Sequence, residues 1–72
     1  MAKTTHRQHI GKMFKMIREF KKLSQEDVCE ISKISRPTLA GLESGELNTS
    51  LDIMVRVASA LNCNLDITLT PN

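Results

Sequence analysis

The chain lacks the features that mark several large classes of protein. It has no apolar run near the ~20 residues that a membrane helix needs, and its N-terminus, MAKTTHRQH, has no apolar core of a secretion signal. Its three glycines form no phosphate-binding loop, and no serine or cysteine is paired with a base as a nucleophile. We therefore expect a cytoplasmic protein, at the nucleoid, with no enzymatic activity and no role at a membrane.

Cysteine and histidine are also scarce, and their spacing fits no metal site. Cys29 and Cys63 are far apart and stand among apolar residues, which predicts reduced cysteines in the core. His6 and His9 could share one helix face, but no thiol or carboxylate stands near them to complete a site. The sequence therefore predicts no metal and no other cofactor.

The 72 residues form one domain with a small core, for which oligomerisation is one usual remedy. The net charge of +2 is unevenly distributed. Residues 1–22 hold seven of the ten Lys and Arg and only one acid, whereas the rest hold three basic and seven acidic residues. The basic segment is either an electrostatic footprint for phosphate or a solvated lysine-rich face.

The first helix is predicted to begin near His6, because Thr5 and Gln8 form a capping pair. Its core face should comprise residues at helical spacing: Ile10, Phe14 and Ile17. A second apolar stripe lies about a quarter-turn away and comprises Met13, Met16 and Phe20. The favoured interpretation is one wide core face, and the alternative is a surface for a protein partner.

Two short helices in tandem follow, each opened by a serine. Ser24 and Asp27 nearly match a capping box and predict a helix over 25–32 that buries Val28, Cys29, and Ile31 or its neighbour. Ser35 precedes Arg36 and Pro37, and proline suits only the first turn, so the next helix should cover 36–43. The linker of about three residues forces a steep crossing, as in a helix-turn-helix.

A fourth helix and a strand are predicted after the polar loop 46–50, which Gly45 opens. Thr49 or Ser50 should cap the helix, and Asn62 should end it. Residues 65–70 then alternate apolar and polar, as in a half-buried strand. Since no second strand exists, it should pair with the same strand of a second subunit, although a frayed tail is the alternative.

Together, the sequence predicts an all-α helix-turn-helix bundle of four to five short helices, with one C-terminal β-strand pairing across a homodimer. Residues 1–9 would form a basic arm and the start of helix 1. Residues 10–63 would form the helix-turn-helix domain, and residues 64–72 the dimerisation strand.

Several short motifs resemble the lambda repressor/Cro-like (XRE-type) helix-turn-helix family over roughly residues 10–63. They read Leu23-Ser24-Gln25, Val28-Cys29, Ile34-Ser35-Arg36, Thr38-Leu39 and Leu42-Glu43-Ser44-Gly45. The final strand narrows the resemblance to the small HipB-like regulators, whose C-terminal strands pair across a dimer. Those regulators are often antitoxins to a serine/threonine-kinase-type toxin.

The resemblance implies a DNA-binding role for particular residues. The base-contacting positions are Ser35, Arg36, Pro37 and Ala40, of which Arg36 suits guanine O6 and N7. The phosphate-contacting positions are Arg18, Lys22, Gln25, Lys33, Thr38 and Asn48. The dimer interface would include Leu65, Ile67 and Leu69.

The resemblance also pairs Arg18 with Glu43, either as a purely structural brace or as a brace that holds the arginine near a phosphate. Relatives usually carry glycine where Lys22 and Lys33 stand, and a non-glycine residue in left-handed conformation costs ~1 kcal/mol or more. Ala40 and Gly41 stand where many relatives carry polar side chains that contact bases, so specificity would depend on DNA shape.

The predicted function is a dimeric, sequence-specific repressor of a palindromic operator in double-stranded DNA. It would be the antitoxin of a HipBA-like operon that it autoregulates, with a kinase-type toxin as partner. The alternatives are a stand-alone regulator without a toxin, and a protein-interaction adaptor with little DNA specificity.

Overall fold

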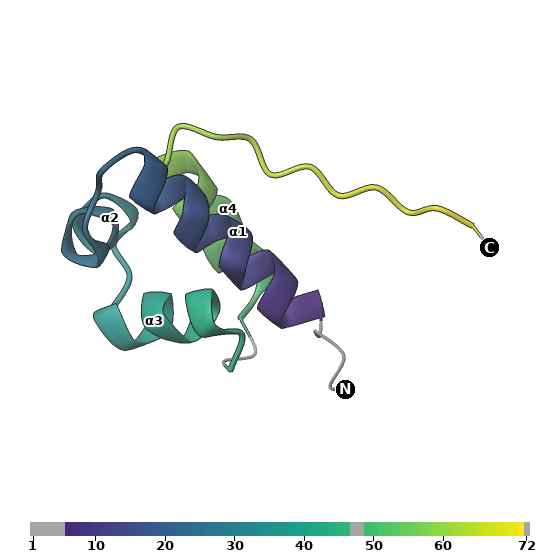
Figure 1. The fold of residues 1–72 in the computed structure, drawn as a ribbon, viewed down its shortest axis with the longest axis horizontal. Coiled ribbons are helices and arrows are strands. Elements are labelled where there is room, and N and C mark those ends of the chain that lie inside the picture. The colour runs from purple at the N-terminus through teal and green to yellow at the C-terminus, as the bar shows by residue number, and fades with distance from the viewer. Residues whose placement is uncertain (1–5, 47–48, 72) are drawn as a thin grey trace.

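The computed structural model describes residues 6–46 and 49–71, which contain four helices and an extended C-terminal segment (Figure 1). In chain order the helices are α1 (His6–Phe20), α2 (Gln25–Ser32), α3 (Arg36–Ser44) and α4 (Leu51–Ala60). The all-α helix-turn-helix class is thus confirmed. Among the described residues there is no strand, and residues 63–71 run as a single extended segment.

Serine side chains set where three of the helices begin. Ser24 and Asp27 form a full capping box, with the Ser24 Oγ accepting from the Asp27 N–H at 3.0 Å and the Ser24 N–H donating to Asp27 Oδ2 at 2.9 Å. That backbone hydrogen bond holds the pKa of Asp27 below its ordinary value. Ser35 and Ser50 cap α3 and α4 through their hydroxyls, which accept from the Thr38 and Ile53 N–H groups, whereas the predicted cap of α1, Thr5, lies outside the described residues.

The predicted left-handed helix ends are also present. Gly45 follows α3 with φ of 78°, and Asn62 follows α4 with φ of 58°. These residues turn the chain away from the helix axis, so that a following N–H can cap the last carbonyl groups. The Gly45 N–H, for example, donates to the Gly41 carbonyl at 3.1 Å.

The core lies where the four helices meet. Its buried side chains are Phe14, Val28, Cys29, Leu39, Leu42, Val57, Ala58 and Leu61, with Ile10, Ile17, Met54 and Cys63 partly buried against them. Both cysteines are free. In α2 the neighbour of Ile31 is the buried residue: Ile31 is exposed, whereas Ser32 is buried and satisfies its hydroxyl by donating to the Val28 carbonyl at 2.6 Å.

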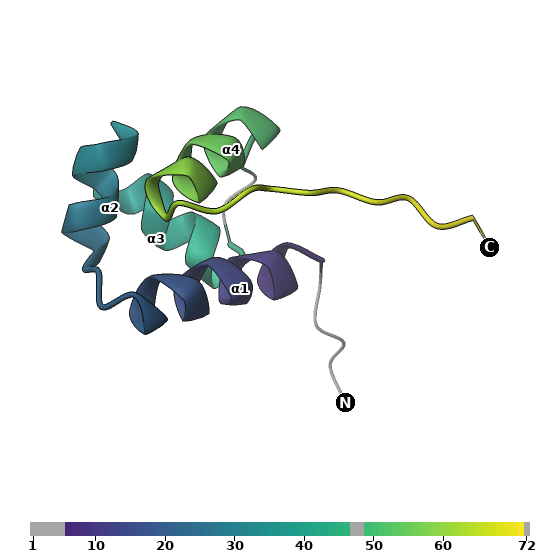
Figure 2. The same cartoon turned by 90° about the horizontal axis from the view of Figure 1, so that it is seen from above.

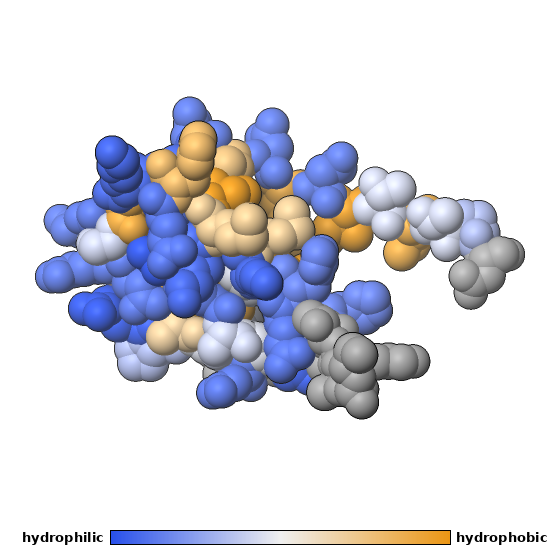
Figure 3. Space-filling view, in the orientation of Figure 1, coloured by the Kyte–Doolittle hydropathy of each residue, from blue (hydrophilic) through white to orange (hydrophobic). Residues whose placement is uncertain are grey.

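The predicted wide core face on α1 is wrong. Met13, Met16 and Phe20 are 51%, 58% and 86% exposed. The reason is tertiary: the C-terminal segment runs between α1 and α4 (Figure 2), and its Leu65 packs on the same core as Ile10 and Ile17 of the first stripe. Apolar side chains consequently gather at the surface along α1 and beside the start of that segment (Figure 3).

Gly11 allows α1 and α3 to approach closely. A Cβ atom at this position would lie 2.6 Å from the Glu43 carbonyl oxygen and closer still to the Leu42 carbonyl oxygen. Both oxygens belong to the backbone, so no side-chain rotation could relieve the overlap. The contact holds the end of α3 against the middle of α1.

Gly11→Ala is therefore expected to destabilise the fold by roughly 1–3 kcal/mol through overpacking, although alanine normally favours a helix over glycine. Urea unfolding followed by circular dichroism measures the difference. Lys15→Ala, an exposed change in the same helix, is the control and should stay within about 0.5 kcal/mol of the parent chain. Equal stability of Gly11→Ala and the parent would contradict the close α1–α3 contact.

Candidate nucleic-acid interface

The outer face of α3 is the part of the helix-turn-helix that is open to a DNA groove. Leu39 and Leu42 point into the core, and the exposed positions on the other side are Arg36, Pro37, Ala40 and Ser44. The structure therefore brings three predicted base-contacting residues onto one face, next to the exposed Ser35 at the helix start. Ser44 shares this face and was missed, although its position eight residues after Arg36 is a signal that helical periodicity gives.

The N-terminal end of α3 combines the positive end of the helix dipole with the charge of Arg36. No acidic residue lies in the first turn of α3 to offset them. Ser35 Oγ accepts from the Thr38 N–H at 3.3 Å and lies 2.7 Å from Thr38 Oγ1. These two exposed or half-buried hydroxyls retain further hydrogen-bonding capacity toward a phosphate or a base.

Arg18 lies at the junction of three helices and uses all three of its guanidinium nitrogens there. Its Nε donates to Glu43 Oε2 at 2.7 Å, its Nη2 to Glu43 Oε1 at 3.1 Å, and its Nη1 to the Leu23 carbonyl at 2.8 Å. The side chains of Arg18 and Glu43 are only 11% and 4% exposed. The hydrogen bond to Glu43 raises the pKa of Arg18 above its ordinary value, so the guanidinium keeps its charge.

Gln25 joins the same network from the first turn of α2. Its Nε2 donates to Glu43 Oε1 at 3.1 Å, which connects the start of α2 to the end of α3. The sequence predicted the Arg18–Glu43 pair but not this third member. Glutamine and glutamate so far apart in the sequence give no local signal of a contact.

Lys22 and Lys33 adopt the left-handed backbone conformation, at positions where relatives usually carry glycine. Their φ angles are 59° and 61°, and both side chains are exposed. The turn after α2 keeps its capping hydrogen bond, because the Lys33 N–H donates to the Cys29 carbonyl at 2.8 Å. Each lysine is held in a strained backbone position with its charge directed to solvent.

The other predicted site residues lie away from the α3 face or outside the described residues. Asn48 falls outside the described residues. Leu65 packs against the core from the C-terminal segment, whereas Ile67 and Leu69 are 62% and 91% exposed. No group of three or more histidine, cysteine or acidic side chains in the described ranges could hold a metal ion.

A family model described as helix-turn-helix (HTH_3, XRE-type) matches residues 14–67. The chain belongs to this family. As an XRE-type helix-turn-helix protein it is a DNA-binding transcriptional regulator, and regulators of this family are not enzymes. None of the helices within residues 6–46 and 49–71 has the length and apolar character to cross a membrane.

Solved structures of other helix-turn-helix proteins are similar to it. The restriction-modification controller protein C.AhdI from Aeromonas hydrophila is 32% identical, with 79% of this chain and 86% of that chain covered and a TM-score of 0.76. The clp gene regulator ClgR from C. glutamicum is 24% identical, with 86% and 80% covered and a TM-score of 0.80.

A chain in the HipA-HipB-O2-O3 complex is 17% identical, with 99% of this chain and 100% of that chain covered and a TM-score of 0.80. At this identity the likeness shows the fold alone. Among curated protein sequences, none matches.

Replacing Lys33 separates its effect on the stability of the fold from its effect on DNA binding. Lys33→Gly removes the left-handed strain and is expected to stabilise the fold by about 1 kcal/mol. Lys33→Ala keeps the strain and should leave stability nearly unchanged. Both variants lack the charge, so both should weaken binding to all duplex DNA. The slope of log affinity against log salt concentration should fall by about 1, the share of one phosphate contact.

Thermal unfolding and fluorescence anisotropy at several salt concentrations measure these effects. Salt dependence in both variants identical to that of the parent would show that Lys33 makes no contact with the DNA backbone.

Proposed function

We propose that this regulator is a homodimeric, sequence-specific repressor that inserts the N-terminal half of α3 into the major groove of a palindromic operator. The observation that carries the proposal is the open, positively charged start of α3, with Ser35, Arg36, Pro37 and Ala40 on its free side. Arg36 is the strongest reader, because its planar fork matches guanine O6 and N7. Since Pro37 and Ala40 offer only apolar contact, DNA shape contributes to the remaining specificity.

Phosphate contacts flank this face in the proposed complex. The strained lysines Lys22 and Lys33 project toward solvent, and Thr38 supplies a hydroxyl beside the start of α3. The N-terminus of α2 carries Gln25 and binds a phosphate through its backbone N–H groups. Arg18, braced by Glu43, and Asn48 complete the proposed set of phosphate contacts.

The proposed dimer forms through the C-terminal segment. Within the described residues, no backbone group of 64–71 is hydrogen-bonded to another backbone group. An extended segment with unpaired N–H and C=O groups and alternating apolar residues is a template for a second strand. Leu65, Ile67 and Leu69 would then lie on the buried side of the pair.

We further propose that the protein is the antitoxin of a kinase-type toxin and represses its own operon together with it. Support comes from the likeness to HipB, which extends over 99% of this chain and therefore includes the C-terminal segment. HipB itself occurs in a complex with HipA. A stand-alone controller is the second candidate, favoured by the higher identity to C.AhdI, whose match covers only 79% of this chain.

Arg36→Ala is expected to lower affinity for the operator by ~1–3 kcal/mol and to relax the preference at one base pair in each half-site. Anisotropy titrations with operator and random duplexes measure both effects. Arg56→Ala, which removes an exposed arginine from α4, is the matched control and should change operator binding little. An equal loss on operator and random DNA would show Arg36 to be a phosphate contact.

The antitoxin proposal is tested by expressing the neighbouring genes of the operon with and without this protein. We expect one neighbour to arrest growth alone, and growth to recover when the regulator is co-expressed. The control is the Arg36→Ala variant, which should still restore growth if toxin binding is separate from DNA reading. If no neighbour is toxic, or toxicity persists with the regulator present, the stand-alone controller is the correct function.

A further inference from the structure

Five exposed residues of α1 follow the spacing by which one helix pairs with another. They stand alternately three and four residues apart, as the a and d positions of a coiled coil do, and they are His6, His9, Met13, Met16 and Phe20. The three apolar members are each at least half exposed. These five residues form the α1 seam, a helix-pairing surface that no other helix of the described chain covers.

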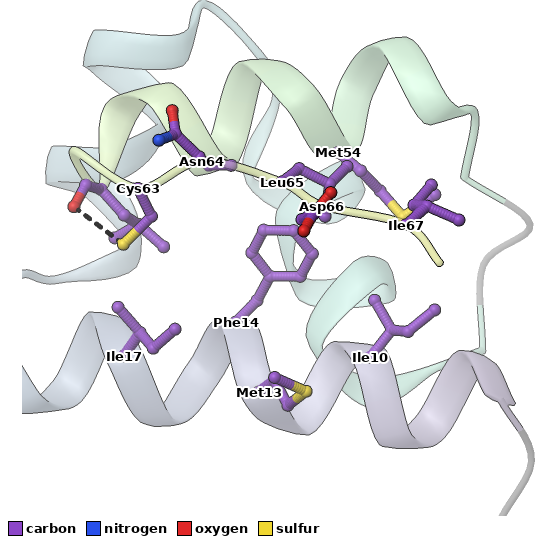
Figure 4. Close-up of a pocket in the computed structure, with 12 residues that line it drawn as sticks. Ile10, Met13, Phe14, Ile17, Met54, Cys63, Asn64, Leu65, Asp66 and Ile67 are labelled. Atoms are coloured by element: carbon purple, nitrogen blue, oxygen red, sulfur yellow. Dashed lines mark hydrogen bonds between the residues drawn. The ribbon is translucent and has the colours of Figure 1, made fainter. Parts of the chain in front are cut away.

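The α1 seam points away from the recognition helix. At ~100° per residue, its apolar members lie roughly 140–180° around α1 from Gly11, which faces the end of α3. Ile10, Phe14 and Ile17 point instead toward the C-terminal segment and line a groove of about 380 Å³ there, with Met13 at its edge (Figure 4). A partner on the seam therefore leaves α3 free.

Two residues of opposite charge border the seam on one side. Lys12 and Glu19 each precede an a position by one residue, which makes them the g positions of the heptad, and both are exposed. Neither forms an ion pair within the described part of the chain. The e positions on the other side are Ile10 and Ile17, which pack against the core. Charges that could select a partner thus stand on one edge of the seam.

This one-sided pattern favours a second copy in the antiparallel orientation. In a parallel pair each g position faces an e position of the other helix, so Lys12 and Glu19 would meet no opposite charge. In an antiparallel pair g faces g, and Lys12 of one copy can meet Glu19 of the other. The seam is therefore complementary to itself when the two helices run in opposite directions.

Charge also decides the register of such a pair. When Met13 faces Met16 of the second copy, Lys12 faces Glu19 on both sides of the two-fold axis. A shift by one heptad in one direction would oppose Lys12 to Lys12, and a shift in the other direction would oppose Glu19 to Glu19. Like charges at neighbouring positions are destabilising, so the first register is the favourable one.

We propose that the α1 seam binds the α1 seam of a second copy, antiparallel, with Met13 on Met16 and Lys12 beside Glu19. The flexible methionine side chains fill the contact between the helices. This association goes beyond the proposed function and does not use the C-terminal segment, so in a regulator that is already a dimer it joins two dimers. Because the seam faces away from α3, the joined regulators can hold two DNA sites at once.

Exchanging the two charges tests this pairing in the full chain. Lys12→Glu opposes Glu to Glu in both contacts, and Glu19→Lys opposes Lys to Lys, so each variant should weaken self-association roughly fivefold or more. An equimolar mixture of the two variants restores both contacts in a mixed pair, and the double variant restores them with itself. Sedimentation equilibrium at up to ~1 mM chain measures the association, because one helix pair buries less than about 1,200 Å² and binds weakly.

Lys15→Glu is the matched control. It makes the same change of charge at an exposed residue of α1 that lies outside the seam, so it should leave self-association at the parent level. Met16→Gln should weaken self-association with no change of charge. Circular dichroism verifies that each variant keeps its helices.

Recovery of self-association in the mixture, beside its loss in each single variant, supports the pairing. The proposal is overturned if the parent shows no association step that Lys12→Glu weakens, or if the mixture with Glu19→Lys fails to recover it. Binding of the parent to phosphatidylglycerol vesicles that Met16→Gln abolishes would assign the seam to an anionic membrane surface instead. A dimer held by the C-terminal segments is insensitive to these charges, so its failure is distinguishable from failure of the seam.

Discussion

The buried ion pair between Arg18 and Glu43 fixes the geometry on which DNA recognition depends. Both carboxylate oxygens of Glu43 accept hydrogen bonds, from Arg18 and Gln25, and the third nitrogen of the guanidinium donates to the Leu23 carbonyl. No buried side-chain nitrogen or oxygen in the described residues is left without a partner. Removing one member of such a pair typically costs about 3–5 kcal/mol, because the other charge remains buried.

This network also orients α3 relative to α1 and α2. Glu43 stands near the end of α3, Gln25 at the start of α2, and Arg18 near the end of α1. The three side chains therefore set the crossing angle of α3 relative to the other two helices, together with the close approach at Gly11. A recognition helix must be held within a narrow angle for its side chains to meet base edges, and this network holds α3 in place.

The lysines at the two turns show a conflict between stability and binding. A chain of this size has a small core and little stability to spare. Keeping Lys22 and Lys33 in left-handed conformation costs about 1 kcal/mol each, which glycine would avoid. In the proposed complex, a cation in the turn before α2 and another in the turn between α2 and α3 would contact phosphate, and this would offset the strain.

The sequence predicted the helices well because their ends are determined locally. Ser24 with Asp27, Ser35 before Pro37, and Gly45 act within one turn of chain, and α2 runs over the predicted residues. Burial was harder to predict. The exposed Met13 depends on where the C-terminal segment crosses α1, which the helical period of one segment cannot reveal.

The candidate site was likewise only partly predictable. The face of α3 followed from periodicity, but the Gln25–Glu43 contact joins distant residues. In the proposed dimer, the state of residues 65–70 would depend on a second chain, which the local pattern of one chain does not determine.

The central claim, a two-fold symmetric reader of DNA, is tested most directly by selecting binding sites from a random duplex pool with the full chain. The account predicts a palindromic motif with a guanine in each half-site, and half-sites separated by about one helical turn, ~34 Å, or a multiple of it. Enrichment of a single asymmetric half-site, or of no motif at all, would contradict it.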